Sequence, residues 1–395
     1  MRTLFKNKIE DSWLFYVLIV LPCFNFLGKG SLFYLIFALF ACFKMVANIR
    51  LDSNFFFSLL LTLSVALASV AFYDFNEVIK AFNYVLLYLV GYNGFFAAYD
   101  KIKFIKRTIA AIFTGFAANI VVTYFYNLNR VNTDYYRILY NFWTGELIAV
   151  TIIGLLSSVV IGYSFYAIFV QKKLATKIIG IISVVFMILI NVQTATRTPF
   201  LLLVITYLFM FLLRFLNGTQ RKKARGLVLF ALIMTFMVLL YQNDTWGIKT
   251  YVLSTPIYER FMDEGMETSR IEIFKFYFDN MSKSFLGGDK VHALYGQSAH
   301  NFIQEGFDKY GILALVSLLG LSINIIASTV KMICIKRKTD IEFLLIAMYI
   351  SIMIQICLEP TFDGYPVAIM SLLMVHGMAS AYNLKRDDLI RSVVE

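Results

Sequence analysis

Charged residues are scarce in this chain of 395 amino acids, and their scarcity argues against an ordinary water-soluble domain. Asp, Glu, Lys and Arg make up 15% of the sequence, whereas hydrophobic residues make up 59%. A typical soluble domain carries about 25% charged residues. Instead, apolar stretches of about 20 residues recur along the chain, the length that a helix needs to cross a bilayer. The composition predicts an all-α polytopic membrane protein.

Cysteine is also scarce, and several motifs of soluble enzymes are missing. The four Cys residues lie in or at the ends of apolar stretches, and none forms a CxxC pair. We expect them to be buried and inert, with neither a disulfide framework nor a metal site. The sequence contains no GxSxG, HExxH or Walker motif and no nucleotide-binding glycine motif. We therefore expect no metal and no cofactor.

The apolar stretches predict about twelve transmembrane helices within one integral membrane domain, residues 1–395. The expected spans are 12–28, 31–48, 54–73, 78–99, 108–127, 146–170, 177–193, 199–216, 226–243, 310–333, 341–358 and 365–384. No small-residue cleavage site follows the first span, which we interpret as a retained helix and not a signal peptide. The sequence shows no internal repeat and no separate soluble domain.

Lys and Arg are distributed unequally between the two sides of the predicted membrane. If the chain starts in the cytoplasm, about two thirds of its 36 Lys and Arg residues fall on the cytoplasmic side, as the positive-inside rule requires. Most acidic residues fall on the other side. The pattern predicts that both termini are cytoplasmic. It also explains the net charge of +11 by membrane insertion and not by binding to nucleic acid.

The longest outer connection, residues 244–309 between spans nine and ten, contains a predicted amphipathic helix. Ser269 and Glu272 form a capping box in "ETSRIEIFKFYFDNMSKSF" (267–285), which places the helix start at Arg270. Arg270 falls on the apolar face, where an unpaired charge is costly. A helix N-terminus favours an anion, so we expect a phosphate there. The alternatives are an ion pair with a loop carboxylate and an Arg side chain that extends to the membrane surface.

A second arginine follows a group of polar residues at the outer end of span seven. In "NVQTATRTPF", Arg197 comes after Asn191, Gln193, Thr194 and Thr196. Polar side chains at that depth are expected to face a cavity and not lipid. Arg197 is therefore either a second anion-binding residue or an anchor of the helix end in the lipid headgroups.

Three histidines occur, and the most informative is His300 in "SAHNFIQEGFDKYGI" (298–312). We expect Ser298 to cap a helix that runs into span ten, with His300 and Gln304 on one face. A neutral imidazole can accept a proton from a sugar hydroxyl. The alternative is a His that only caps or hydrogen-bonds a loop. His292 is expected in a turn, and His376 is expected to be packed and hydrogen-bonded inside span twelve.

These features together resemble the bacterial O-antigen ligase and O-antigen polymerase family. The similarity rests on about twelve spans, on the large outer loop between spans nine and ten, and on short motifs. The motifs are "TATRTPF" (194–200), "SRIEIF" (269–274), "FLGG" (285–288) and the stretch around His300. They cover about residues 185 to 320, and the span pattern covers the rest of the chain.

The resemblance implies a metal-independent, inverting glycosyltransferase with the membrane-embedded type C architecture. Such an enzyme lies in the bacterial inner membrane with its active site facing the periplasm. It transfers a glycan from undecaprenyl diphosphate to an acceptor sugar. By this resemblance Arg197 and Arg270 hold the diphosphate, and His300 deprotonates or orients the acceptor hydroxyl. Further contacts to glycan or phosphate are expected from Arg130, Arg137, Lys290 and Gln304.

Polymerase and ligase differ in the acceptor, which is another lipid-linked repeat unit or the lipid A core. The outer loop is short for a ligase, and together with a composition of 39 Phe and 21 Gly it favours the polymerase. Further expected partners are a chain-length regulator and the lipid bilayer. A flippase or transporter is a third interpretation. Transporters of this size usually show related halves, and no such halves are visible here.

Overall fold

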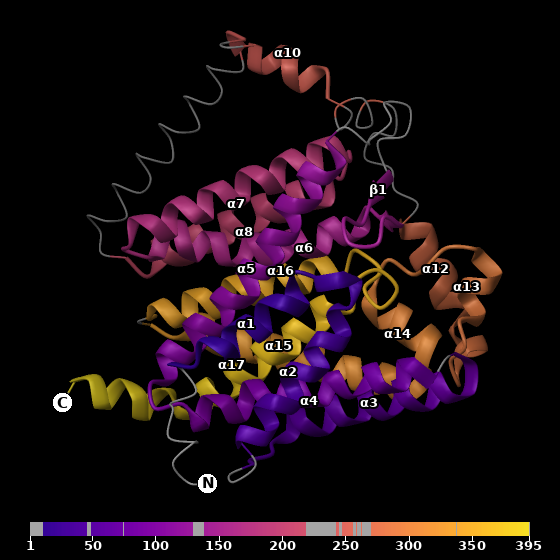
Figure 1. Ribbon diagram of the computed structural model, residues 1–395, viewed down its shortest axis with the longest axis horizontal. Helices are drawn as coiled ribbons and strands as arrows, with labels where there is room; N and C mark the ends of the chain where they lie inside the picture. The colour runs from indigo at the N-terminus through magenta and orange to yellow at the C-terminus, as the bar shows by residue number, and fades with distance from the viewer. Residues whose placement is uncertain are drawn as a thin grey trace.

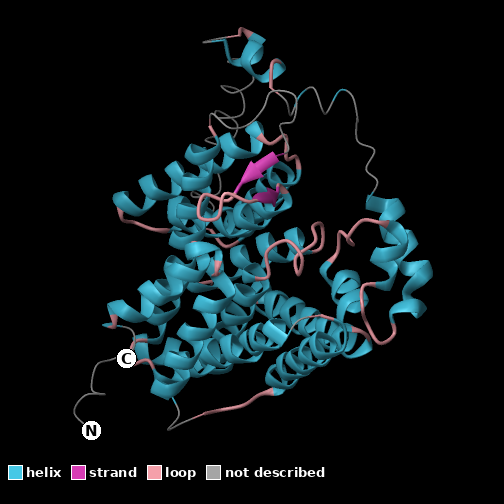
Figure 2. Ribbon diagram, turned by 45° about the vertical axis from the view of Figure 1, so that its right-hand side comes forward, coloured by secondary structure: helices cyan, strands magenta, loops and turns pink. Residues whose placement is uncertain are grey.

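The structure is a computed structural model that describes residues 11–45, 49–73, 75–128, 138–218, 242–244, 247–255, 258, 262, 270–336 and 338–394. In these residues the fold is α-helical apart from one two-stranded antiparallel sheet (Figure 1, Figure 2). The long helices are α1 (Trp13–Cys23), α2 (Gly30–Met45), α3 (Ser53–Phe72), α4 (Phe75–Ala97), α5 (Lys101–Asn127), α6 (Thr151–Phe165) continued by the π-helical turn η4 (Tyr166–Val170), α7 (Leu174–Gln193), α8 (Thr198–Leu216), α15 (Ile312–Cys334), α16 (Asp340–Ile356) and α17 (Val367–Val394). The connections hold η2 (Phe26–Gly28), β1 (Ile138–Tyr140), β2 (Leu147–Ala149), α10 (Ile248–Leu253), α12 (Arg270–Asn280), η6 (Met281–Ser284), α13 (Lys290–Tyr295) and α14 (Phe302–Tyr310).

In the described residues helices occupy the predicted spans, apart from the start of the span 146–170, which forms β2. The predicted span 226–243 lies almost wholly outside them. Seven helices are long and apolar enough to cross a membrane, namely α3, α5, α6 with η4, α7, α8, α15 and α17. The all-α membrane class is therefore confirmed, whereas the number of twelve spans stays a prediction.

The centre of the bundle is a close pair of helices, α4 and α17. A Cβ atom on Gly91 would lie 2.1 Å from the carbonyl oxygen of Met374, and a Cβ on Gly377 would lie 2.3 Å from that of Tyr88. Small residues let helix backbones approach this closely inside membranes. Gly91 and Gly377 thus allow α4 and α17 to pack with their backbones in close contact.

The helices run between two ends of the bundle, which we call the basic end and the loop end. The basic end carries the first described residue, Asp11, in an ion pair with Lys103 at 2.6 Å, and an ion pair between Arg386 and Glu342 at 2.7 Å. The loop end carries β1, β2, α12, α13, α14 and residues 357–366. In Figure 1, α12, α13 and α14 lie on the side of the molecule away from the C-terminus.

The sheet corrects the prediction of a helix that starts at residue 146. β1 and β2 form a hairpin in which Ile138 pairs with Ala149 and Tyr140 with Leu147 (Figure 2). The amide of Asn127, at the end of α5, fixes the hairpin, since it accepts the backbone N–H of Tyr140 at 2.8 Å and donates to its carbonyl at 3.0 Å. Helix α6 therefore begins only at Thr151.

Several predictions about the two histidine segments were wrong. The helix before span ten is capped by Asn301 and not by Ser298, because the Asn301 carboxamide accepts the N–H of Ile303 at 2.9 Å. His300 therefore precedes the helix and shares no helix face with Gln304. The helix also stops at Gly311, whose φ of +80° favours glycine. His292, expected in a turn, lies within the short helix α13.

Candidate functional site

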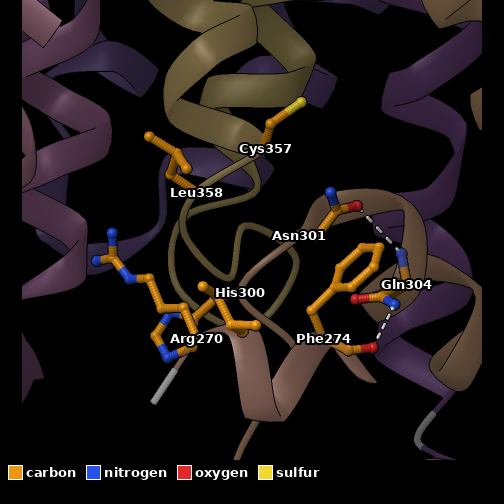
Figure 3. A pocket seen from close by; sticks show the side chains of 8 residues that line it. Arg270, Phe274, His300, Asn301, Gln304, Cys357 and Leu358 are labelled. Atoms are coloured by element: carbon orange, nitrogen blue, oxygen red, sulfur yellow. Dashed lines mark hydrogen bonds between the residues drawn. The ribbon is translucent and has the colours of Figure 1, made fainter. Parts of the chain in front are cut away.

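A pocket of about 180 Å³ lies at the loop end, where α12, the segment before α14 and the end of α16 meet (Figure 3). The lining combines apolar side chains with a guanidinium, an imidazole and two carboxamides, as ligand sites commonly do. The lining residues are Arg270, Ile271, Phe274, His300, Asn301, Gln304, Cys357 and Leu358.

Arg270 is the first residue of α12, and its guanidinium reaches the loop that comes after α16. Its Nη2 donates to Glu359 Oε1 at 2.5 Å and to Thr198 Oγ1 at 3.0 Å, and the Thr198 hydroxyl donates to the same carboxylate oxygen at 3.2 Å. Glu359 is 3% exposed and Arg270 is 32% exposed. Of the alternatives that the sequence leaves open, the ion pair with a loop carboxylate is present. Within the described chain Nη1 and Nε have no hydrogen-bond partner and are available to a ligand.

His300 approaches the same carboxylate from the other side. Its Nδ1 lies 3.4 Å from Glu359 Oε2, a distance at which a protonated ring and a carboxylate form an ion pair. Both atoms are buried, and neither has a hydrogen-bond partner among the described residues. The contact is therefore electrostatic and not a hydrogen bond. If Nδ1 carries the proton, Nε2 is the acceptor. This is the arrangement of a general base that a carboxylate orients.

The loop that carries Glu359 is held in place by a second buried carboxylate, Glu305 on α14. Glu305 accepts the backbone N–H groups of Thr361 at 2.5 Å, Phe362 at 3.0 Å and Asp363 at 2.6 Å. Burial raises the pKa of Glu305 to about 8, and the Asp363 carboxylate adds to the rise, whereas the three N–H groups oppose it. Because α14 begins just after His300, this contact fixes Glu359 and His300 relative to each other.

A lysine ties the same loop to α3 and to the start of α13. Lys309 pairs with Asp363 and lies 3.6 Å from Asp289, and Asp289 also accepts the hydroxyl of Tyr73 at 2.6 Å. Burial works against the charge of Lys309, but the two carboxylates outweigh it and raise the pKa of Lys309 above its ordinary value. The loop end is thus braced by charged side chains that are separate from the residues that line the pocket.

The "FLGG" motif has a structural explanation. Gly287 has a φ of +90°, and a Cβ atom there would lie 2.5 Å from the carbonyl oxygen of Lys309. The next residue, Gly288, donates its N–H to that same carbonyl at 3.0 Å. Only glycine fits such a close approach at positive φ. The motif therefore joins the end of η6 to the end of α14.

The predicted site residues are only partly brought together. Arg270, His300 and Gln304 line one pocket, and Gln304 Nε2 donates to the carbonyl of Phe274 at 3.1 Å. Arg197 is half-buried and directly precedes Thr198, the hydroxyl partner of Arg270, but it is not one of the described residues that line the pocket. Lys290 is exposed at the start of α13. Arg130 and Arg137 lie outside the described residues.

Glu359 is the site residue that sequence reasoning missed. It lies 89 positions from Arg270 and 161 from Thr198 along the chain, so no local spacing relates them. The available signal was the stretch "LEPTFDGYP" (358–366), where two carboxylates stand between two apolar spans. An acidic residue at such a boundary is expected to face protein or water and not lipid.

No group of three or more His, Cys, Asp or Glu side chains in the described part of the chain is arranged to hold a metal ion. No protein-family model matches the sequence, and no curated protein matches it. A function for this chain is therefore inferred from the geometry of the site and from the motif resemblance.

Proposed function

We propose that the protein is a glycosyltransferase of the bacterial inner membrane that elongates a surface polysaccharide such as O-antigen. Its donor is a glycan on undecaprenyl diphosphate, and its acceptor is the terminal sugar of another lipid-linked repeat unit. In this proposal the chain crosses the membrane about twelve times. The basic end faces the cytoplasm and the loop end faces the periplasm, in agreement with the positive-inside distribution of Lys and Arg.

The proposed reaction is a single in-line displacement at the anomeric carbon of the donor. The acceptor hydroxyl gives its proton to Nε2 of His300 while its oxygen bonds to that carbon, and the bond from the carbon to the phosphate oxygen breaks. Arg270 stabilises the negative charge on the departing lipid diphosphate. Arg197, which directly precedes Thr198, the hydrogen-bond partner of Arg270, also stabilises this charge. Glu359 stabilises the imidazolium that forms, because its Oε2 lies 3.4 Å from Nδ1 of His300.

One observation carries this proposal: Arg270 and His300 line a single pocket at the end of the bundle opposite the basic end. A cation for a leaving phosphate and a base for a hydroxyl are the two groups that such a transfer needs. Arg270 and His300 come from different segments of the chain, and the fold brings both to the same pocket.

The test uses purified protein with lipid-linked repeat units and no nucleotide. We expect longer lipid-linked glycans, with the rate reduced by about 100-fold or more in Arg270→Ala. Lys275→Ala is the matched control, because Lys275 is an exposed cation on the same helix outside the pocket. Equal ladders of glycan chains from Arg270→Ala and the control would reject the role of Arg270. A strict requirement for a divalent metal would reject the mechanism.

A deletion strain separates the polymerase from the ligase. If the protein is the polymerase, lipid A core should carry a single repeat unit. Bare core together with accumulated lipid-linked polymer would instead show that the acceptor is the lipid A core. A strain that keeps lipid-linked precursor on the cytoplasmic side would indicate a flippase and contradict the enzymatic proposal.

A further inference from the structure

A second pocket at the loop end has no charged residue in its lining. It lies between the ends of α1 and α5, the β1–β2 hairpin and the start of α6. Its lining residues are Asn25, Asn119, Thr123, Asn141, Phe142, Trp143, Ile148, Ile152 and Tyr365. Its volume is about 30 Å³, room for one small polar group or about two water molecules. The absence of charge suits a neutral ligand and not a phosphate.

Three of the side chains that line this pocket carry N–H groups, namely Asn25, Asn141 and Trp143. The carboxamide oxygen of Asn25 accepts the N–H of Gly30 at 3.0 Å, and that of Asn141 accepts the N–H of Trp143 at 2.9 Å. Neither Asn25 nor Asn141 donates a side-chain hydrogen bond to another described residue, and the buried Nε1 of Trp143 has no hydrogen-bond partner among them. An unpaired buried donor such as Trp143 Nε1 costs free energy. The pocket is therefore complementary to a ligand with acceptor oxygens.

An aromatic cluster surrounds the indole of Trp143. Its ring centroid lies 4.4 Å from that of Phe142, 4.8 Å from that of Phe26 and 5.6 Å from that of Phe24. The adjoining Leu27 has a φ of +54°, which costs a branched side chain free energy and is tolerated only when surrounding contacts impose it. Flat aromatic surfaces next to carboxamides are the chemistry that binds sugars, which have apolar C–H faces and polar hydroxyl edges.

We propose that this second pocket binds an uncharged, oxygen-bearing substituent of a sugar, such as a hydroxymethyl group. It is a glycan subsite for the proposed glycosyl transfer, and it rests on that proposed function. The loop of residues 357–366 lines both pockets, because it contributes Cys357 and Leu358 to the first and Tyr365 to the second. The proposal therefore requires that one glycan contact the second pocket through a sugar while its reacting end lies at His300.

The test exploits the small number of tryptophans, of which the sequence has three. Full-length protein with Trp13→Phe and Trp246→Phe keeps Trp143 as its only tryptophan. Glucose, galactose and N-acetylglucosamine are titrated separately while the emission of Trp143 is recorded. We expect a saturable change with at least one of these sugars. Ligand-observed NMR on the same samples provides a reading that does not depend on emission.

The deciding variant is Asn141→Asp, which keeps an oxygen for the N–H of Trp143 but removes the NH2 donor. We expect it to weaken sugar binding by tenfold or more. Gln297→Glu is the matched control, since it makes the same charge change at an exposed amide of the loop end and should bind sugar normally. The melting temperature of each variant checks that it is folded.

Absence of saturable binding by both methods, or equal binding by Asn141→Asp and the control, would overturn the subsite. Its failure is distinguishable from that of the proposed function. If Arg270→Ala elongates glycans normally while sugar still binds near Trp143, the transferase proposal fails and the subsite stands. If Arg270→Ala abolishes elongation while Asn141→Asp neither binds differently nor elongates differently, the subsite alone fails.

Discussion

Replacing Glu359 by Gln should have opposite effects on phosphate binding and on catalysis. In the structure the carboxylate neutralises Arg270 through a contact of 2.5 Å and faces His300 at 3.4 Å. Glutamine has nearly the same shape but no charge. The guanidinium would then be free to bind an anion more tightly, whereas the imidazole would lose the group that orients it and stabilises its protonated form.

The size of both effects can be worked out from the contacts. A hydrogen bond between charged partners contributes about 1.5–3 kcal/mol, and the lower value applies because Arg270 is 32% exposed and water competes for it. About 1.4 kcal/mol corresponds to a factor of ten, so inorganic pyrophosphate should bind about tenfold more tightly to Glu359→Gln. The loss at His300 should lower the rate of elongation by about 100-fold, at the lower end of what general acid–base catalysis contributes.

Two assays on the purified protein in detergent decide between these effects. Titration calorimetry measures pyrophosphate affinity, and single-turnover elongation of lipid-linked glycan measures the rate. Glu272→Gln is the control, because it removes an exposed carboxylate from the same helix without touching the pocket. If Glu359→Gln binds pyrophosphate more weakly than the control, Glu359 helps to build the anion site, and its role as a competitor for the guanidinium is refuted. Unchanged elongation would refute the role assigned to the His300–Glu359 pair.

Three other variants test the remaining contacts. His300→Gln should retain pyrophosphate affinity within a factor of about two but slow elongation by about 100-fold or more. Calorimetry measures the affinity, and the single-turnover assay measures the rate. Weaker pyrophosphate binding would instead assign His300 to phosphate binding. Gly377→Ala should destabilise the protein by about 1–3 kcal/mol, because the new Cβ would lie 2.3 Å from the carbonyl oxygen of Tyr88, and thermal unfolding in detergent would measure the loss. The pKa of Glu305 rises from its ordinary 4.5 to about 8 on folding, so its contribution to stability is complete below pH 4.5 and is lost as pH rises through 8. The melting temperature should therefore fall between these two pH values. Glu305→Gln should make the melting temperature less dependent on pH.

The positions of the helices could be predicted because length and hydrophobicity decide which segments cross a bilayer. The β1–β2 hairpin could not. Its strands "ILY" and "LIA" have three residues each, too few to show an alternating pattern, and the second runs directly into the apolar residues of α6. What fixes the hairpin is Asn127, a polar residue in the last turn of α5 whose partners become apparent only in three dimensions.

The site shows the same division between local and distant signals. Arg270 and His300 could be predicted as site residues because each is an ionisable group in an apolar setting, which is a local property of the sequence. The helix cap could also have been found, since Asn is as good an N-cap as Ser and Asn301 stands directly before Phe302. The partnership with Glu359 could not, because it depends on how α8, α12 and α16 pack together.

The loop of residues 357–366 is the element on which both pockets depend, and its own stability depends on Glu305. A buried carboxylate with a raised pKa is costly to ionise, yet three backbone N–H groups would have no acceptor without it. An apolar residue at position 305 would therefore release the loop and not simply repack. Such a change should disturb phosphate binding at Arg270 and sugar binding near Trp143 together, whereas Glu359→Gln should disturb only the first. The two pockets are thus coupled by the backbone of one loop, and joint loss in a Glu305→Leu variant that is still folded is the result that this coupling requires.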